Sequence, residues 1–492
     1  MNTFMNEMKK ESNYTVTENG ALTHRTTLDK VWDMFAFGGA YRKRTNEDCI
    51  LLFKEAYEQN PVYALKCLFY LSDCRGGQGE RRFFRVCFNW LAKKYPDKAA
   101  ELVPMIPEYR RWDDIIYSCI DTPVQEVAFK FINHQLCLDM ESKTPSLCAK
   151  WMPSENASSC TTKRAASYLR TYLKLTHKEY RAMLSHLRQK INIVERLMSE
   201  NRWDEIEFDK LPSQAGLKYK NTFAHKEITA ARYKAFMESK STKVNASVLN
   251  PVEIANKAFD CRADLESAER LAIQKYWDSL PNYYNGEPEN GIAVVDVSGS
   301  MSGTPMAAAV SLGAYIAEKS HGPFANHFIT FSSNPNFVEF VGVDIVDKFK
   351  RCLRADWGMN TNIEAVFDLL LSIAKRKNVK PEDMPKRLYI FTDMEFDAAT
   401  TSWSYGRRSD SINKDTLFES IAKRWREAGY EMPHLIFWNL DARQNNIPML
   451  SDGVYSYVSG FNPSMIKYIL SGKNGIDLMY ETLDSDRYKD IK

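Results

Sequence analysis

Residues 291–300 read GIAVVDVSGS, a short continuous apolar run that ends at Asp296 and leads into serines and a glycine. A run of this length, bounded by turn-forming residues, is typical of a strand buried on both faces of a parallel sheet. Open α/β sheets bind ligands at the carboxyl ends of their strands. We therefore expect Asp296 to lie at a sheet edge, on a tight loop that precedes a helix.

Similar apolar runs follow, and helical patterns separate them. The runs lie at 328–331, 387–391, 435–438 and 454–458, with amphipathic helical patterns at about 305–319, 362–377 and 414–428. Buried strands that alternate with helices predict a doubly wound parallel sheet of the Rossmann-like α/β class.

The first half of the chain has a different pattern. From about residue 28 to 280, apolar residues recur at helical spacing and strand-like alternation is scarce. No regular sequence period marks a known solenoid repeat, so we expect an irregular α-helical solenoid. The expected segments are a flexible head at 1–27, a helical domain at 28–285, the α/β domain at 286–475 and a C-terminal tail at 476–492.

The composition is that of a globular protein. Hydrophobic residues make up 44% of the 492 residues and charged residues 26%, with a net charge of only +3, which excludes a fibrous or mainly disordered chain. The ten cysteines form no C-x-x-C pair, so we expect reduced core thiols. The polar N-terminus and the lack of a long apolar run predict a cytoplasmic protein without a membrane segment.

A set of oxygen-bearing residues predicts a metal site at the sheet edge. Asp296, Ser298 and Ser300 share one loop, and Thr361 and Asp393 come from later loops in the order that the strands require. Hard oxygen ligands with few full charges suit octahedral Mg²⁺ or Mn²⁺ that keeps some of its waters. The alternative is the same fold with an idle site.

Other residues near this loop carry no catalytic signature. Met301 stands where a nucleophile elbow needs Ser, and no P-loop or dinucleotide fingerprint occurs. Glu395 and Asp397 are expected to be solvated loop charges. We expect no enzyme activity and no small-molecule substrate.

Basic residues concentrate in the helical half. Segment 140–250 holds 20 Lys and Arg against 11 Asp and Glu, a net charge of +9, and tyrosines are interleaved with them. Basic faces with aromatics suit single-stranded nucleic acid, although a solvated helical surface has the same composition. The candidate RNA-binding residues in this segment are Lys163, Arg164, Arg170, Lys218, Lys220 and Lys226.

Two further motifs leave alternatives open. The loop 75–82 (RGGQGERR) either contacts phosphate through Arg75, Arg81 and Arg82 or forms a tight interhelical turn whose arginines pair with acids or water. The stretch 108–114 (EYRRWDD) is either a recognition surface or a buried polar network at a helix start.

Long, ordered phrases connect the chain to a known family. They are LSDCRGGQGER (71–81), RWDD (111–114), AKWMPS (149–154), PSQA (212–215), DVSGSM (296–301), DWGMNTN (356–362), FTDMEFD (391–397) and FWNL (437–440). On these phrases, which span about residues 30–470, the chain is identified as a member of the "domain of unknown function 2828" family. Its arrangement is similar to the Ro autoantigen (TROVE-domain) proteins, in which a HEAT-like helical domain precedes a von Willebrand factor A domain.

The resemblance implies a site and a function. Asp296, Ser298, Ser300, Thr361 and Asp393 match the metal-ion-dependent adhesion site (MIDAS) of the A domain, where a partner's carboxylate can complete the metal shell. In Ro proteins the helices form a ring that binds small structured RNAs and single-stranded RNA ends. We therefore expect a non-enzymatic, Ro-like ribonucleoprotein whose helices bind RNA and whose A domain binds a protein partner. The alternative is a metal-dependent scaffold with no RNA role.

Overall fold

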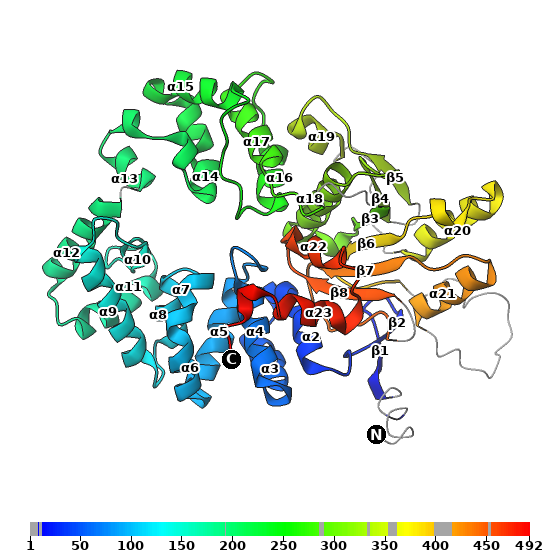
Figure 1. Cartoon of the computed structure of the whole chain (residues 1–492), viewed down its shortest axis with the longest axis horizontal. Coiled ribbons are helices and arrows are strands. Elements are labelled where there is room, and N and C mark those ends of the chain that lie inside the picture. The colour runs from blue at the N-terminus through cyan, green and yellow to red at the C-terminus, as the bar shows by residue number, and fades with distance from the viewer. Residues whose placement is uncertain are drawn as a thin grey trace.

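The chain folds into a helical part followed by an α/β part (Figure 1). The computed structural model describes residue 8 and the ranges 12–191, 193–284, 290–331, 335–352, 362–397, 416–450 and 454–492. The helices of the first part are α2 (Lys30–Phe37), α3 (Asn46–Gln59), α4 (Pro61–Ser72), α5 (Arg81–Lys94), α6 (Pro96–Leu102), α7 (Ile106–Tyr109), α8 (Asp113–Cys119), α9 (Gln125–Glu141), α10 (Cys148–Trp151), α11 (Cys160–Tyr172), α12 (His177–Ile191), α13 (Val194–Ser199), α14 (Ser213–His225), α15 (Glu227–Glu238), α16 (Pro251–Asp260) and α17 (Ala268–Asp278).

The helices form because each sequence segment can bury one apolar stripe. In α3, Cys49, Leu52, Phe53 and Ala56 recur at three- and four-residue spacing and are all buried. Thr45 begins this helix with a capping box that satisfies backbone N–H groups of the first turn. The helical periodicity of the first half is therefore confirmed.

The α/β part is built on one sheet with the strand order β5-β4-β3-β6-β7-β8. The strands are β3 (Gly291–Asp296), β4 (His327–Phe331), β5 (Asn336–Glu339), β6 (Arg387–Thr392), β7 (His434–Asn439) and β8 (Tyr455–Ser459). All pairings are parallel except that of β5 with β4. The five predicted strands are confirmed, whereas β5 was not predicted because it is a short, half-exposed edge strand.

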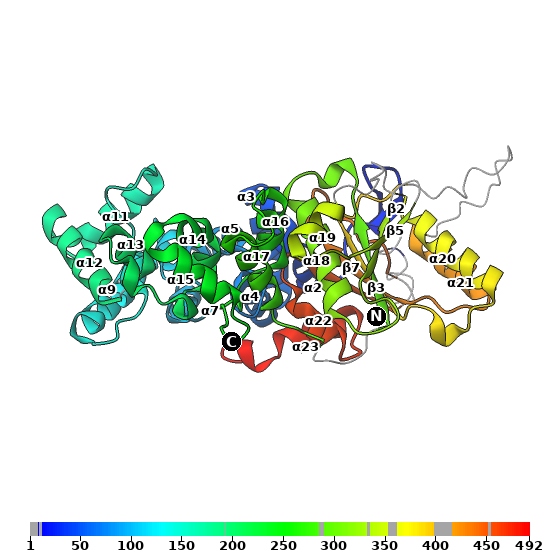
Figure 2. The same ribbon diagram turned by 90° about the horizontal axis from the view of Figure 1, so that it is seen from above.

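Helices α18 (Thr304–Lys319), α19 (Ile345–Cys352), α20 (Glu364–Lys377), α21 (Leu417–Glu427), α22 (Ile466–Ile469) and α23 (Gly475–Leu483) complete this part. Helix α18 packs against β3, β4 and β6. Figure 2 shows the helical part and the sheet side by side in one elongated body, with α20 and α21 at the end remote from the helical part.

The helices of the first part follow an arc, and both ends of the arc pack on the α/β part (Figure 1). At one end α2 contacts β8, and at the other end α16 contacts α18 and α19 while α17 contacts α19. Arg270 of α17 also makes a two-bond ion pair with Asp344, which precedes α19, at 2.5 and 2.9 Å. The two parts are thus joined at two separate places.

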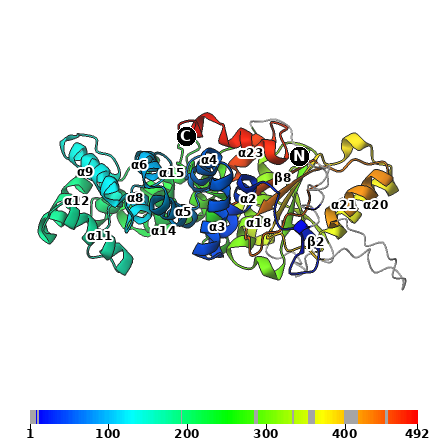
Figure 3. The ribbon, with the colours of Figure 1, turned by 90° about the horizontal axis from the view of Figure 1, so that it is seen from below.

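The ends of the chain differ from the expected free head and tail. Strands β1 (Tyr14–Val16) and β2 (Leu22–His24) form a hairpin that docks on the α/β part, where Thr17 Oγ1 donates to the carbonyl of Phe396 at 2.6 Å. At the other terminus α23 packs against α2, α4 and β8 (Figure 3). Residues 12–27 and 476–492 are therefore part of the packed structure, because long-range contacts hold segments that look polar in sequence.

Two sequence-based expectations concern the core and the membrane. All ten cysteines are free thiols, and seven of them are buried as expected of core residues, whereas Cys74, Cys137 and Cys160 are exposed. Among the described residues, no helix combines the length and the apolar composition that crossing a lipid bilayer requires.

Candidate metal centre

The carboxyl ends of two neighbouring strands bring two aspartates to one edge of the sheet. Asp296 is the last residue of β3, and Asp393 directly follows β6. These strands pair in parallel, with Val295 opposite Phe391. Both aspartates are completely buried. The parallel register therefore places the two carboxylates together, as the sequence predicted.

The loop after β3 supplies the hydroxyl groups of the site. Ser298 donates its backbone N–H to Asp296 Oδ1 at 2.9 Å, and the Oγ atoms of Ser298 and Ser300 lie 2.9 Å apart. Ser300 also forms a side-chain hydrogen bond with Asp393. Thr392 Oγ1 donates to Asp296 Oδ2 at 2.7 Å and so orients that carboxylate. Four of the five predicted ligands therefore form one connected cluster.

Thr361, the fifth predicted ligand, lies outside the described residues. Within the described ranges, no three His, Cys, Asp or Glu side chains gather closely enough to hold a metal ion on their own. A metal at this edge thus depends on the serine hydroxyls as well as on the two carboxylates. This donor set, hard oxygens with only two full charges, fits Mg²⁺ or Mn²⁺ that retains water ligands.

The two carboxylates carry unfavourable electrostatics in the absence of a cation. Burial raises the pKa of Asp296 to about 7, and the neighbouring Asp393 carboxylate contributes to the rise. Burial also raises the pKa of Asp393, against the opposing effects of Ser300 and Arg443. A divalent cation between them would favour the charged form of both groups.

Arg443 is a neighbour of the site that sequence patterns did not reveal. Its Nη2 donates to Asp393 Oδ2 at 3.1 Å, and its Nη1 lies 2.9 Å from Glu18 Oε2 in the N-terminal hairpin. Glu18 and Arg443 are far apart in sequence and belong to no motif. Only the docking of the hairpin brings them to the site.

The prediction that Glu395 is a solvated loop charge is wrong. Its side chain is fully buried, and it accepts hydrogen bonds from the backbone N–H of Glu18 at 2.7 Å and from Asn446 Nδ2 at 2.9 Å. Asp397 is half-buried and pairs with Gly20 through an isolated β-bridge. The N-terminal hairpin covers this loop, which explains why its charges leave solvent.

The loop 75–82 forms a turn between α4 and α5 and docks on the C-terminal segment. A side chain at Gly77 would collide with the carbonyl of Tyr70, since a Cβ there would lie 1.8 Å from that oxygen. Gln78 is buried and accepts from the backbone N–H of Asn462 at 3.0 Å. Arg82 donates to the carbonyls of Tyr41 and Arg44. These contacts favour the interhelical turn over the phosphate loop.

The remaining basic candidates separate into side chains with and without an ion pair. Lys220 is buried and bonds Glu269 at 2.7 Å, while Arg170 pairs with Glu155 and Arg164 with Asp121. Arg75 is exposed and donates to the carbonyl of Glu108. Arg81 contacts Asp113 and Asp114. The exposed lysines Lys163, Lys218 and Lys226 make no ion pair within the described residues.

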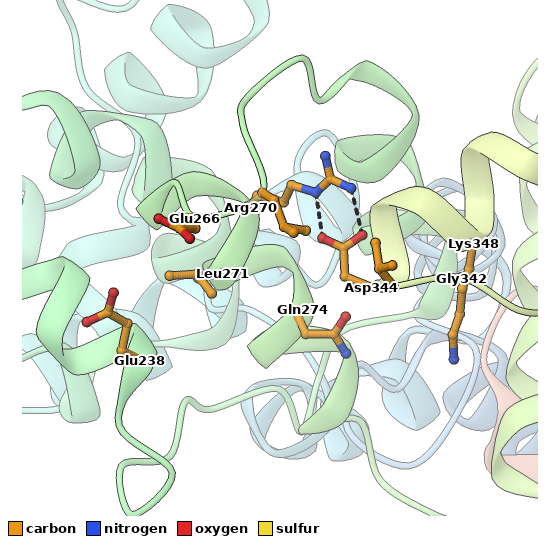
Figure 4. A pocket seen from close by; sticks show the side chains of 10 residues that line it. Glu238, Glu266, Arg270, Leu271, Gln274, Gly342, Asp344 and Lys348 are labelled. Atoms are coloured by element: carbon orange, nitrogen blue, oxygen red, sulfur yellow. Dashed lines mark hydrogen bonds and ion pairs between the residues drawn. The ribbon is translucent and has the colours of Figure 1, made fainter.

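A cavity of about 650 Å³ lies away from the candidate metal centre, at the junction between the helical part and α19 (Figure 4). The Arg270–Asp344 pair lines it, together with Glu238, Glu266 and Leu271. None of the proposed metal ligands lines this cavity. It reflects the joint between the two parts of the chain rather than the acid and hydroxyl cluster.

Fold and site define a two-part protein in which a helical arc is joined to a parallel α/β domain with an acid and hydroxyl cluster at its strand ends. Residues 17–110 and 145–281 match the family "Domain of unknown function (DUF2828)", and residues 290–491 match "Domain of unknown function (DUF7788)". An uncharacterized protein of Acanthamoeba polyphaga mimivirus is 30% identical to this chain over 96% of the chain and 88% of the viral protein. The chain belongs to the DUF2828 family, as its sequence phrases indicated.

Proposed function

We propose that the chain is a non-enzymatic binding protein whose α/β domain is of the von Willebrand factor A type and captures a protein partner through a bound Mg²⁺ ion. The observation that carries this proposal is the single cluster formed by Asp296, Ser298, Ser300 and Asp393 at the ends of β3 and β6. The match of these residues to the sequence positions of the metal-ion-dependent adhesion site supports the proposal.

In this proposal the chain's own residues hold the ion and leave room for a ligand. The residues that would hold Mg²⁺ are Asp296, Ser298, Ser300, Thr361 and Asp393. The ion supplies a Lewis-acidic position that a partner's carboxylate can occupy. Thr392 fixes the orientation of the Asp296 carboxylate, and Arg443 holds Asp393. A carboxylate-bearing protein surface is therefore the class of partner that the site suits.

Partner capture by the full-length chain tests this proposal. The protein is crosslinked to its partners in Mg²⁺ and in chelator, together with the Asp296→Asn variant. Asp383→Asn, which changes an exposed aspartate outside the site, is the matched control. We expect a partner that is captured by the wild type and by the control in Mg²⁺ only, and not by Asp296→Asn. Capture that survives both chelation and Asp296→Asn would contradict the proposal.

A second candidate function, RNA binding by the helical arc, is favoured by its exposed basic residues. Lys218 Nζ lies 4.7 Å from the ring centre of Tyr219, and Lys226 Nζ lies 5.1 Å from that of Trp203. The exposed lysines suit phosphate contacts, and the partly exposed Tyr219 ring suits base stacking, whereas the Trp203 ring is buried. The arc joined to the α/β domain at both ends resembles the HEAT-like ring expected of a Ro-like protein.

Crosslinking in cells followed by sequencing of bound RNA tests the second function. The control is a triple variant, Lys163→Glu, Lys218→Glu and Lys226→Glu, which reverses exposed charges without breaking an ion pair of the described structure. We expect RNA to be recovered with the wild type and depleted with the variant. Equal recovery from both would remove this surface from the proposal and leave the metal-dependent scaffold.

A further inference from the structure

Four arginines surround two aspartates where α5 meets the start of α8. We call this group the arginine cluster, and its members are Arg81, Arg85, Arg110, Arg111, Asp113 and Asp114. Helices α5 and α8 pack directly on each other. The cluster connects the motif 108–114 to the end of the loop 75–82, the two motifs whose roles the sequence left open.

The two carboxylates are shared among all four guanidinium groups. Asp114 accepts from Arg81 Nη2 at 3.1 Å, from Arg85 Nε at 2.5 Å and from Arg110 Nε at 3.2 Å. Asp113 receives the Nη2 groups of Arg81 and Arg85 at 3.1 Å, and Arg111 binds it through both Nε and Nη2 at 3.0 and 2.8 Å. Every acid of the cluster is thus already in use.

The cluster therefore carries two uncompensated positive charges. Arg110 is buried, and it donates to the carbonyls of Ser72 and Glu80 in addition to Asp114. Burial, with contributions from Arg81 and Arg85, lowers the pKa of Arg110 to about 10 against the opposing effect of Asp114. The guanidinium groups of the cluster therefore repel one another, and a bound anion would reduce this repulsion.

Three of the arginines still present donors to solvent. The side chains of Arg81, Arg85 and Arg111 are 37%, 27% and 33% exposed. No hydrogen bond from Nη1 of any of the three is found within the described residues. Spare guanidinium donors in fixed planes are suited to the oxygens of a phosphate group.

Two of the exposed guanidinium groups lie over aromatic rings. The guanidinium carbon of Arg111 lies 4.0 Å from the ring centre of Trp151, and that of Arg85 lies 4.3 Å from the ring centre of Tyr117. Nucleic-acid bases stack on such guanidinium planes and on aromatic rings. The combination of spare donors, net charge and flat planes favours RNA over an isolated inorganic anion.

We infer that the arginine cluster is a phosphate-binding subsite for single-stranded RNA, in which Arg81, Arg85 and Arg111 contact the phosphodiester and the Arg111 plane carries an adjacent base. This inference rests on the proposed RNA binding by the helical arc and gives it a specific site. Asp113 and Asp114 hold the arginines in place for this contact. The buried Arg110 holds Asp114 in place through its hydrogen bond from Nε.

The chain offers a matched control for this cluster in Arg202. Its side chain is 42% exposed, and it pairs with two acids, Glu200 and Glu205. Since Arg196 also pairs with Glu200, this group holds two arginines and two glutamates, so its charges are balanced and it lacks the positive excess of the cluster. Replacing either Arg111 or Arg202 by Gln removes one partly exposed guanidinium, but only Arg111 faces an excess of positive charge.

Fluorescence anisotropy with the full-length protein tests the inference. The probe is a labelled single-stranded RNA of mixed sequence, about 20 nucleotides long, titrated at several salt concentrations between about 50 and 200 mM. Arg111→Gln is expected to weaken binding about tenfold and to reduce the salt slope by about one. Arg111→Lys, which keeps the charge but not the plane, is expected to fall between wild type and Gln. Arg202→Gln is expected to bind as the wild type does, and thermal unfolding confirms that each variant is folded.

The possible failures are distinguishable. In one outcome the wild type binds RNA and the triple variant Lys163→Glu, Lys218→Glu, Lys226→Glu binds it less, but Arg111→Gln binds as the wild type does with an unchanged salt slope. That outcome refutes the subsite and leaves the proposed RNA function standing. If the wild type does not bind RNA, both the subsite and the proposed RNA function are refuted. Inorganic phosphate or a phosphothreonine peptide that binds the wild type more tightly than the RNA does, and loses affinity in Arg111→Gln, would overturn the assignment to RNA.

Discussion

The candidate metal centre and the arginine cluster both contain buried charges, but their charge imbalances have opposite signs. At the sheet edge two buried carboxylates face one arginine, whereas in the helical part four arginines share two carboxylates. The first group lacks positive charge and the second lacks negative charge. Charges left unbalanced in a folded protein are costly unless a ligand completes them, so the comparison points to a cation at one site and an anion at the other.

The comparison predicts unequal effects of the same chemical change at the two sites, and this difference is the largest effect expected. Asp114→Asn leaves the buried Arg110 without its carboxylate, and we expect a loss of about 3 kcal/mol or more in the free energy of unfolding. Asp296→Asn removes repulsion with Asp393, and we expect a change within about 1 kcal/mol in metal-free buffer. Urea denaturation of the full-length variants in chelator measures both. Equal destabilisation by the two substitutions would remove the distinction.

Within the basic segment, Lys218 and Lys220 distinguish a lysine that can contact RNA from one that stabilises the fold. Lys220 is buried against Glu269, so Lys220→Met is expected to destabilise the chain by about 2 kcal/mol by leaving that carboxylate without its cation. Lys218 is exposed, so Lys218→Met is expected to leave stability unchanged within about 0.5 kcal/mol and to weaken RNA binding a few-fold. Thermal unfolding and RNA titration of both variants check this. A stable Lys220→Met protein would show that the lysine is not a structural residue.

The two parts also differ in their expected response to acid. Burial between β7 and β8 lowers the pKa of His434 from 6.5 to about 4, while Arg110, Arg85 and Arg81 lower that of Asp114 below its usual value of 3.8. The unfolded chain therefore binds a proton at His434 before the folded chain does. The stability that neutral His434 provides is present above pH 6.5 and is lost as the pH falls toward 4. The Asp114 contribution is lost only below 3.8.

His434→Gln isolates this effect. The wild type is expected to lose about 2 kcal/mol more than the variant between pH 7 and pH 4.5, which is the part of the pH dependence that belongs to the histidine. Urea unfolding at the two pH values measures the difference. Parallel losses in wild type and variant would mean that His434 accepts a proton in the folded state.

Local sequence patterns were sufficient for the five buried parallel strands and for the acid and hydroxyl cluster, but not for the edge strand β5 or the hairpin β1–β2. Buried parallel strands are continuous apolar runs, and residues such as Asp296 and Asp393 directly follow them, so their proximity is a consequence of the parallel register. The same reasoning could not reach Glu395, because its burial depends on a hairpin more than 370 residues earlier in the chain.

Composition was the weaker guide in the helical part. A count of Lys and Arg cannot distinguish Lys220, which is buried against Glu269, from the exposed Lys218 two positions away. Nor could it show that Arg81 belongs to a cluster with residues 30 positions later, since that contact depends on how α5 packs against α8. Helical periodicity gives the buried face but not the partners of the polar one.

Mg²⁺ binding by the full-length chain tests the central claim most directly. Isothermal titration of the chelator-treated protein compares the wild type with Asp296→Asn and Ser300→Ala, with the exposed Asp383→Asn as control. The account predicts saturable binding of Mg²⁺ by the wild type and the control, with a matching rise in thermal stability. It predicts no binding by Asp296→Asn and weaker binding by Ser300→Ala. No binding by the wild type, or equal binding by all four proteins, would contradict it.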